Sequence, residues 1–351
     1  MMLVLNTGSS SIKIAVFDAA LNLVIQGNIT GVGHAGRMTL GDDKSDVIST
    51  DHADALDHLL DCLVARGIPL DQITSAAHRV VHGGRRLTAP CRITDETIAQ
   101  INAMIPLAPL HNPPALAGIA AVTAQLPDVP QFASFDTAFH ATQPEVATAY
   151  ALPKAQRDAG IQRYGFHGLS YAGMVRQFGD AVPPRLLALH LGAGVSLCAI
   201  KQGKSLATSM GYSPLSGPTM ATRTGDIDGM AVLRIAQELG LEAATHLLNN
   251  ESGLLGLSGT SADMRTLLAD PSDAAQFAVD HFIWSVVHQA GSLIAVMEGV
   301  DGIGFTGGIG ENSAPIRDRI MARLAWLGDV PTHIIPADEE RQIAIDATSL
   351  L

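Results

Sequence analysis

The stretch MLVLNTGSSSIKIAVFD (2–18) places one glycine and three serines between two apolar runs. Short apolar runs bounded by turn residues are typical of buried strands, so residues 2–6 and 12–18 are predicted to form a hairpin, with a third strand over 21–29. The turn lacks the GxxxxGK[ST] pattern and is not a Walker loop. Its backbone N–H groups and hydroxyls can bind an anion, and strand alternation puts Lys13 on the less apolar strand face. An anion site and a plain polar hairpin tip both stay open.

The stretch RLLALHLGAGVSLCAIKQGKSLATSM (185–210) repeats this order of strand, small-residue turn, strand, turn and strand. The pattern recurs but the residues do not, which indicates two related α/β halves. Such halves suggest the duplicated ribonuclease H-like fold of actin, hexokinase and sugar kinases, in which the nucleotide lies in a cleft between two domains. We expect domains over 1–140 and 141–335, with the tail 336–351 packing back on the first.

Helical and strand signals alternate over the rest of the chain. Apolar spacing after Asp51 predicts a helix over 51–66 that stops at Gly67. Strands are predicted within 75–84 and 131–140, and a strand, glycine turn and helix over 302–328. Further helices are predicted at 95–105, after the prolines of 107–116, at 228–249 and at 273–298.

Composition bounds the class of protein. The chain has 351 residues, of which 47% are hydrophobic and 16% charged, with a net charge of −12. This acidic balance argues against nucleic acid or an anionic membrane as the main partner, although arginines in a cleft can still bind an anionic substrate. The cysteines Cys62, Cys91 and Cys198 form no CxxC, which argues against a disulfide framework or a zinc site. No apolar run reaches 18 residues, so a cytoplasmic protein is expected.

Two further glycine turns and several charged residues carry possible chemistry. HLGAGVS (190–196) and GGIGEN (307–312) are each either a tight turn or a nucleotide site, and three such turns in one duplicated chain favour the nucleotide. Arg79, in an apolar strand, needs an internal carboxylate or a bound anion. Arg223 lies in TRTGDID beside Asp226 and Asp228, where a local ion pair is the alternative. The spacing of Asp136 and His167 does not decide their roles.

Taken together, these segments resemble the acetate kinase family, which includes propionate kinases. The matching motifs run in the family's order: NTGSSSIK, HRVVHGG, LAPLHNP, FDTAFH, RYGFHG, HLGAGVS, TSMGYSPLSG, TRTGDID, SGLLGLSGTSADMR, FTGGIGEN and PADEE. The resemblance implies reversible transfer of the ATP γ-phosphoryl group to acetate or another short carboxylate, giving an acyl phosphate and ADP. It also implies a homodimer.

The resemblance carries roles over motif by motif. Arg79 would bind the substrate carboxylate, and His167 and Arg223 would stabilise the transferring phosphoryl group. Asn6 and Glu339 would hold Mg²⁺, or Mn²⁺ as an alternative. The apolar wall of the substrate site would be Val81, Leu110, Phe166 and Pro214, near His111. The ATP phosphates would meet Ser9, Ser10, Ser11, Lys13, His190, Leu191, Gly192, Ala193 and Gly194. The adenosine side would be Asp263, Met264, Arg265, Gly308, Ile309, Gly310, Glu311 and Asn312.

Asp136 is commonly cast in this family as an acid or base. A carboxylic acid substrate is already ionised at pH 7, since carboxyl pKa values lie at about 4. We therefore expect Asp136 to orient an arginine or a metal-bound water.

The chain departs from the family pattern at several places. Ala193 replaces an asparagine of the phosphate turn, which removes a hydrogen-bonding amide. Leu169 and Tyr171 replace the threonine and histidine of the GTSH motif, and ADEE (337–340) replaces TNEE. Segment 30–50 is polar and looks trimmed, with surface elements missing.

These departures leave alternatives open. A propionate kinase is the nearest, because one methylene in an apolar pocket gives only about 1–3 kcal/mol of discrimination. A catalytically weakened module that binds nucleotide as a sensor is the other.

Overall fold

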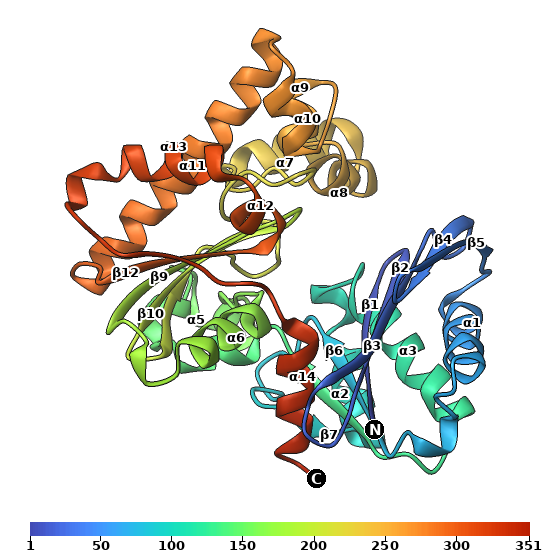
Figure 1. Cartoon of the computed structure of the whole chain (residues 1–351). Helices are drawn as coiled ribbons and strands as arrows, with labels where there is room; N and C mark the ends of the chain where they lie inside the picture. Colours follow the sequence, from blue (N-terminus) through green and yellow to red (C-terminus); the bar gives the residue numbers. More distant parts are fainter. The chain divides into compact units, whose positions relative to one another are not determined.

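The computed structural model describes residues 1–351, and the chain divides into two compact units. Unit 1 comprises residues 1–139 and 338–351, and unit 2 comprises residues 140–337. Figure 1 colours the chain from the N-terminus in blue to the C-terminus in red. The last helix of the chain therefore appears in red although it belongs to unit 1, together with the first blue strands.

Unit 1 is built on an eight-stranded sheet in the order β5-β4-β3-β2-β1-β6-β8-β7. Its strands are β1 (Met2–Gly8), β2 (Ser11–Phe17), β3 (Leu23–Thr30), β4 (Ala35–Leu40), β5 (Asp43–Ile48), β6 (Ser75–Val80), β7 (Cys91–Arg92) and β8 (Gln131–Phe135). Its helices are α1 (His52–Ala65), α2 (Asp95–Ala103), α3 (Asn112–Gln125) and α14 (Glu339–Thr348), with short 3₁₀ turns η1 (Leu70–Gln72) and η2 (Ile105–Leu107). A third turn, η3 (Ala138–Thr142), spans the boundary between the units.

Unit 2 is built on a five-stranded sheet in the order β11-β10-β9-β12-β13. Its strands are β9 (Arg185–Leu191), β10 (Val195–Lys201), β11 (Lys204–Thr208), β12 (Gly302–Thr306) and β13 (Thr332–Ile334). Its helices are α4 (Glu145–Thr148), α5 (Lys154–Asp158), α6 (Gly168–Phe178), α7 (Gly229–Leu239), α8 (Leu241–Asn250), α9 (Gly253–Ser258), α10 (Met264–Ala269), α11 (Asp273–Met297), α12 (Gly307–Asn312) and α13 (Ala314–Arg323), with 3₁₀ turns η4 (Gly179–Ala181) and η5 (Ala325–Leu327).

The two sheets share one topology. In unit 1, β1 pairs antiparallel with β2 and parallel with β6, and β6 pairs parallel with β8. In unit 2, β9 pairs antiparallel with β10 and parallel with β12, and β12 pairs parallel with β13. The order β3-β2-β1-β6-β8 therefore matches β11-β10-β9-β12-β13. The predicted duplication of an α/β unit is confirmed.

Apolar alternation and capping account for the elements around the unit 1 sheet. Leu3, Leu5 and Ile14 are buried in one cluster with the leucines of α1, because alternate residues of a strand share a face. Helix α1 begins at the predicted place, where the Asp51 side chain accepts hydrogen bonds from two backbone N–H groups. Helix α14 packs against β1, β6 and β8, on the side of the sheet away from α1 (Figure 1).

One part of the fold was not predicted. Segment 30–50, for which no strand was expected, forms β4 and β5, a hairpin that extends the unit 1 sheet at its edge. Most of its side chains are exposed. Because neither strand has a continuous apolar face, the alternation that reveals a half-buried strand is absent from the sequence.

The chain has no helix with both the length and the apolar character that crossing a membrane requires.

Candidate active site

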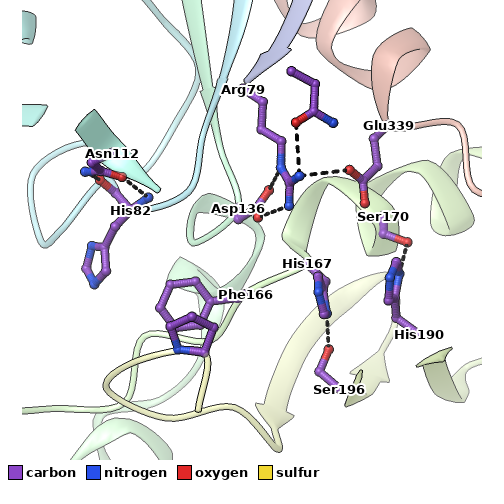
Figure 2. A network of polar contacts seen from close by, with 12 residues as sticks. Arg79, His82, Asn112, Asp136, Phe166, His167, Ser170, His190, Ser196 and Glu339 are labelled. Carbon is purple, nitrogen blue, oxygen red and sulfur yellow. Dashed lines mark hydrogen bonds and ion pairs between the residues drawn. The ribbon is translucent and has the colours of Figure 1, made fainter. Parts of the chain in front are cut away.

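In unit 1 the candidate site is centred on Arg79 of β6. Its Nε donates to Oδ1 of Asp136 at 3.0 Å, and its Nη2 donates to Oδ2 at 2.6 Å (Figure 2). Asp136 directly follows β8, which is the parallel neighbour of β6, so the sheet brings the two side chains together. This two-point contact fixes the plane of the guanidinium. The internal carboxylate that Arg79 was predicted to need is therefore Asp136.

The other end of the guanidinium meets residues from both ends of the chain. Nη1 of Arg79 donates to Oδ1 of Asn6 at 3.2 Å and lies 3.6 Å from Oε2 of Glu339. Asn6 Nδ2 in turn donates to Oε1 of Glu340 at 3.4 Å. Glu339 and Glu340 begin α14, whose packing on β1 places them here. We call Arg79, Asp136, Asn6, Glu339 and Glu340 the Arg79 cluster.

Acidic groups outnumber basic ones in the Arg79 cluster. Burial by itself would lower the pKa of Arg79, but the Asp136 and Glu339 carboxylates raise it, so the guanidinium stays charged. Burial raises the pKa of Asp136 above its ordinary value, and the Arg79 guanidinium limits that rise. One cation thus faces three carboxylates. This excess of negative charge suits a cation more than a bare anion.

In unit 2 the candidate site is centred on His167. His167 is the N-cap of α6 and has a left-handed backbone with φ of 58°. Its Nδ1 lies 2.8 Å from Oγ of Ser196, which is also 2.5 Å from the Tyr171 hydroxyl. His190, near the end of β9, has its Nδ1 2.9 Å from Oγ of Ser170 (Figure 2). We call His167, Ser196, Tyr171, His190 and Ser170 the His167 cluster.

The two imidazoles of this cluster are stacked. The His167 and His190 ring centroids are 4.1 Å apart, with 21° between the ring planes. Two positive charges at this separation would repel by about 4 kcal/mol at the effective dielectric constant of a partly buried site. The stacking therefore disfavours two positive charges on the pair at the same time.

A glycine turn brings a second cationic side chain close to His167. A Cβ atom added at Gly194 would lie 3.1 Å from His167 Nε2 and 3.6 Å from Arg223 Nη2. The absence of a side chain at Gly194 therefore lets His167 and Arg223 approach the backbone of the turn closely. Arg223 is held by a hydrogen bond from its Nη1 to the carbonyl oxygen of Pro214 at 2.8 Å. An imidazole and a guanidinium beside one glycine turn are donors of the kind that bind a phosphate.

The aspartates near Arg223 have other partners. Asp226 accepts a hydrogen bond from the backbone N–H of Gly217 at 2.8 Å, and its second oxygen accepts one from Gln289. Asp228 caps α7 through two backbone N–H groups. Both carboxylates therefore hold the backbone in shape around Arg223.

Backbone hydrogen bonds fix the turn of residues 190–194, which is predicted to bind the ATP phosphates. Gly192 N donates to the Gly194 carbonyl at 3.0 Å, and the exposed Ala193 accepts from Ala221 N at 3.1 Å. Leu191, before this turn, is fully buried. In unit 1, Ser9 and Ser10 are exposed at the tip of the β1–β2 hairpin, with Ser11 half-buried. Lys13 is exposed on β2.

The predicted adenosine-side residues are partly engaged with the protein itself. One oxygen of Glu311 accepts from both Gly307 N and Ala337 N at 2.9 Å, and Asn312 donates to the Gly308 carbonyl. A Cβ at Gly308 would meet nothing within 4 Å, so the backbone of this turn borders open space. Ile309 is half-buried and Gly310 is buried in the same turn.

The second adenosine-side segment is held by an ion pair. Asp263 caps α10 and pairs with Arg265 at 2.7 Å, and these hydrogen bonds lower the pKa of Asp263 to about 2. Met264 between them is buried.

The predicted apolar wall is mixed in exposure. Val81 and Phe166 are buried, Pro214 and His111 are half-buried, and Leu110 is 47% exposed.

Several residues that shape the site were not singled out in the sequence. Asn112 is buried and exchanges hydrogen bonds of 3.1 Å with the backbone N–H and carbonyl of His82, which hold the loop after β6 (Figure 2). Ser170 and Ser196 anchor the two imidazoles. A serine beside a glycine turn is common, so only the fold identifies these two as histidine partners.

The chain matches one family model and several named proteins over most of its length. The model of the Acetokinase family matches residues 1–345. The chain is 40% identical to the acetate kinase of Methylocella silvestris, over all of this chain and 98% of that protein. It is 42% identical to the acetate kinase of Rhodopseudomonas palustris, over 93% of this chain and 87% of that one.

Solved structures of an acetate kinase and a propionate kinase superpose closely on the chain. The crystal structure of a propionate kinase from Francisella tularensis superposes with a TM-score of 0.93 at 33% identity, covering 98% of each chain. That of Porphyromonas gingivalis acetate kinase superposes with a TM-score of 0.90 at 31% identity, covering 99% of each chain.

Proposed function

Because this chain belongs to the acetokinase family, we propose that it transfers the γ-phosphoryl group of ATP to acetate, reversibly, giving acetyl phosphate and ADP. The acyl phosphate forms by direct in-line attack of a carboxylate oxygen on the γ-phosphorus, with ADP as the leaving group. The observation that carries the proposal most directly is the Arg79 cluster, where a buried carboxylate fixes one guanidinium in place. Unit 1 would supply Arg79 for the carboxylate, and unit 2 would supply most of the nucleotide contacts.

Arg79 would bind the substrate carboxylate through its terminal edge. Asp136 engages the side edge formed by Nε and Nη2, and Nη1 contacts Asn6 and Glu339, so the substrate carboxylate would share the terminal edge with these residues. A guanidinium edge matches a carboxylate in a two-point contact. Because the substrate is already ionised at pH 7, no base is required, and Asp136 serves to orient Arg79.

His167 and Arg223 would act on the phosphoryl group. The transition state spreads negative charge over the equatorial phosphoryl oxygens, so catalysis depends on positioning and on donors placed around them. His167 Nε2 and Arg223 Nη2 both lie close to the glycine turn at Gly194, which suits this task. No covalent intermediate is needed.

The remaining nucleotide contacts are proposed for the serine turn of unit 1 and for three segments of unit 2. The residues proposed for the ATP phosphates are Ser9, Ser10, Ser11, Lys13 and residues 190–194. Those proposed for the adenosine side are residues 263–265 and 308–312. At the latter turn the backbone of Gly308 borders open space, which supports a nucleotide contact there.

The donor set of the Arg79 cluster fits a magnesium ion. Mg²⁺ prefers oxygen ligands and is usually held by one or two carboxylates together with waters and phosphate oxygens. Glu339 supplies a carboxylate, Asn6 an amide oxygen, and the surplus of acidic groups calls for positive charge. Bound there, Mg²⁺ or Mn²⁺ would neutralise charge on the phosphoryl oxygens. Its charge would also offset the carboxylates that otherwise repel an anionic substrate.

A propionate preference is the second candidate. The Francisella tularensis structure that superposes closely is a propionate kinase. A pocket bounded by apolar side chains would separate the two acids by only about 1–3 kcal/mol.

Unit 2 also offers a surface for a homodimer. Helix α7 has no buried residue, although it is amphipathic, and its Met230 is 70% exposed and its Leu233 54% exposed. On α11, Phe277 and Trp284 are also exposed, on one helical stripe. Exposed apolar stripes of this kind mark association surfaces, and a second copy of the chain is the occupant we propose.

The three cysteines are free thiols, which supports a cytoplasmic location.

Trapping the product with hydroxylamine tests the proposed reaction. Enzyme, ATP and Mg²⁺ are incubated with acetate, propionate or butyrate, and acyl hydroxamate is measured for each acid. We expect the highest kcat/KM with acetate. A ratio favouring propionate severalfold would select the second candidate, and the absence of hydroxamate with every acid would overturn the kinase proposal.

A further inference from the structure

Tyr171 stands at a position where this chain departs from its family's pattern, and it contacts the partner of the proposed catalytic histidine. Tyr171 is fully buried in α6, and its hydroxyl lies 2.5 Å from Oγ of Ser196. Ser196, also fully buried, in turn lies 2.8 Å from Nδ1 of His167. The three side chains form a continuous line of hydrogen bonds from the interior of unit 2 to the imidazole.

The protons along this line have a favoured order. A phenol is a stronger hydrogen-bond donor than an aliphatic hydroxyl, so at 2.5 Å the Tyr171 O–H donates to Oγ of Ser196. Burial raises the pKa of Tyr171 well above its ordinary value, so the phenol keeps its proton. Ser196, having accepted this hydrogen bond, directs its own hydrogen to His167 Nδ1 and donates a hydrogen bond there.

This order decides which nitrogen of His167 carries hydrogen. In a neutral imidazole one ring nitrogen donates and the other accepts, and the partner of one sets the state of the other. Nδ1 as the acceptor leaves the proton on Nε2. That nitrogen is the ring atom of His167 that lies nearest to the glycine turn at Gly194. The stacked His190 disfavours a second positive charge beside it, and the tautomer assignment applies to the neutral His167 imidazole.

We propose that Tyr171 is a positioning residue which, through Ser196, holds His167 as the Nε2–H tautomer, ready to donate a hydrogen bond to the transferring phosphoryl group. The statement about the tautomer concerns the protein alone, whereas the benefit to phosphoryl transfer rests on the proposed function.

Nitrogen NMR of the full chain labelled with ¹⁵N-histidine tests the tautomer directly. The His167 signals are assigned as those absent from His167→Gln. We expect wild-type His167 to carry its proton on Nε2, and Tyr171→Phe to show a mixture of both tautomers. Ser196→Ala serves as a second variant that breaks the same line. Tyr164→Phe is the matched control, because it also removes a buried tyrosine hydroxyl bond, from Tyr164 to the Gly160 carbonyl, without a link to Ser196.

Steady-state kinetics test the consequence. We expect Tyr171→Phe to lower kcat about fivefold with the KM values for ATP and carboxylate within twofold, and Tyr164→Phe to leave kcat unchanged. A wild-type His167 protonated on Nδ1, or a spectrum unchanged in Tyr171→Phe, would overturn the inference. If the NMR spectra show the expected tautomers but the protein yields no hydroxamate, the proposed function is wrong and the tautomer assignment is still supported.

Discussion

The Arg79 cluster of unit 1 and the His167 cluster of unit 2 hold their central side chains by opposite means. Arg79 is fixed by full charges, with a two-point carboxylate contact and two further acidic groups nearby. His167 is fixed by neutral hydroxyls and a stacked imidazole. Removing one partner of a buried ion pair costs about 3–5 kcal/mol of stability, whereas a neutral hydrogen bond contributes about 1 kcal/mol.

The difference matches the tasks proposed for the two clusters. A substrate carboxylate carries its charge before and after it binds, so a permanently charged guanidinium in a fixed plane suits it. The phosphoryl group gains charge on different oxygens as it transfers, so donors with a defined proton position suit that step. The following substitutions test this contrast, from the largest expected effect to the smallest.

The largest effect is expected for Arg223→Ala in unit 2. Loss of a donor to the transition state should lower kcat about 10³-fold, with little change in the KM for carboxylate. Steady-state kinetics at saturating ATP measure this. Arg319→Ala, which removes an exposed arginine paired with Asp280 on neighbouring helices, is the control and should retain full activity. A kcat within tenfold of wild type would remove Arg223 from the transfer step.

Arg79→Ala should act mainly on binding. Two charge-assisted hydrogen bonds to the substrate carboxylate would be lost, so we expect the KM for carboxylate to rise about 100-fold. The buried Asp136 would also be left without its cation, and stability should fall by about 3 kcal/mol in urea unfolding. Asp136→Ala added to Arg79→Ala should recover part of that loss. A large fall in kcat with an unchanged KM would show that Arg79 and Arg223 have exchanged roles.

Each unit also contains a buried neutral histidine that makes stability depend on pH. Burial lowers the pKa of His78 in unit 1 and of His140 in unit 2 to about 4. In the unfolded chain a histidine titrates near 6.5. Between these values the unfolded state binds more protons, so stability falls as the pH drops from about 6.5 towards 4.

Urea unfolding at pH 7 and pH 5 measures this dependence. Each histidine should account for a loss of about 2 kcal/mol at pH 5. His78→Gln should flatten the pH dependence of unit 1 and His140→Gln that of unit 2. An unchanged pH dependence in either variant would contradict the assignment for that unit.

A smaller effect is expected at the opening turn of unit 1. Lys13→Ala should raise the KM for ATP about threefold, because Lys13 is exposed and its charge is screened by solvent. Lys44→Ala, on the exposed hairpin β4–β5, is a matched control for the loss of one surface charge. A KM for ATP equal to that of wild type would show that this turn is only a hairpin tip.

The smallest effect is expected at the corresponding turn of unit 2. Ala193→Asn adds an amide at an exposed position between Gly192 and Gly194. Because water competes at this exposed position, one additional hydrogen bond should contribute only about 0.5 kcal/mol and raise kcat/KM for ATP about twofold to threefold. A decrease would indicate that the turn in this chain is shaped for the smaller residue.

Much of the fold was predictable because its signals are local. Apolar spacing and capping predict the strands of both opening hairpins and the start of α1 at Asp51. They also predict the helix that follows the prolines of segment 107–116. The polar hairpin β4–β5 was missed, since its pairing depends on the edge of an existing sheet and on no apolar pattern of its own.

For the candidate site, sequence reasoning indicated which residues carry chemistry but not how they are held. The need of Arg79 for an anion followed from its apolar strand, and the choice of Asp136 followed only from the pairing of β6 with β8. Glu340 and Ser196 were not singled out. Their partners lie 334 and 29 residues away in the chain, and a single sequence records no such proximity.

The sequence by itself determined the duplicated α/β architecture, because each strand and helix has its own apolar pattern within a short segment of the chain. It also determined which charged residues could not remain without a partner. The tertiary structure alone decided the partners: which carboxylate faces Arg79, which serine holds His167, and which nitrogen of that ring is turned to the glycine turn. These are contacts between distant segments, and their geometry exists only once the strands and helices of each unit have packed together.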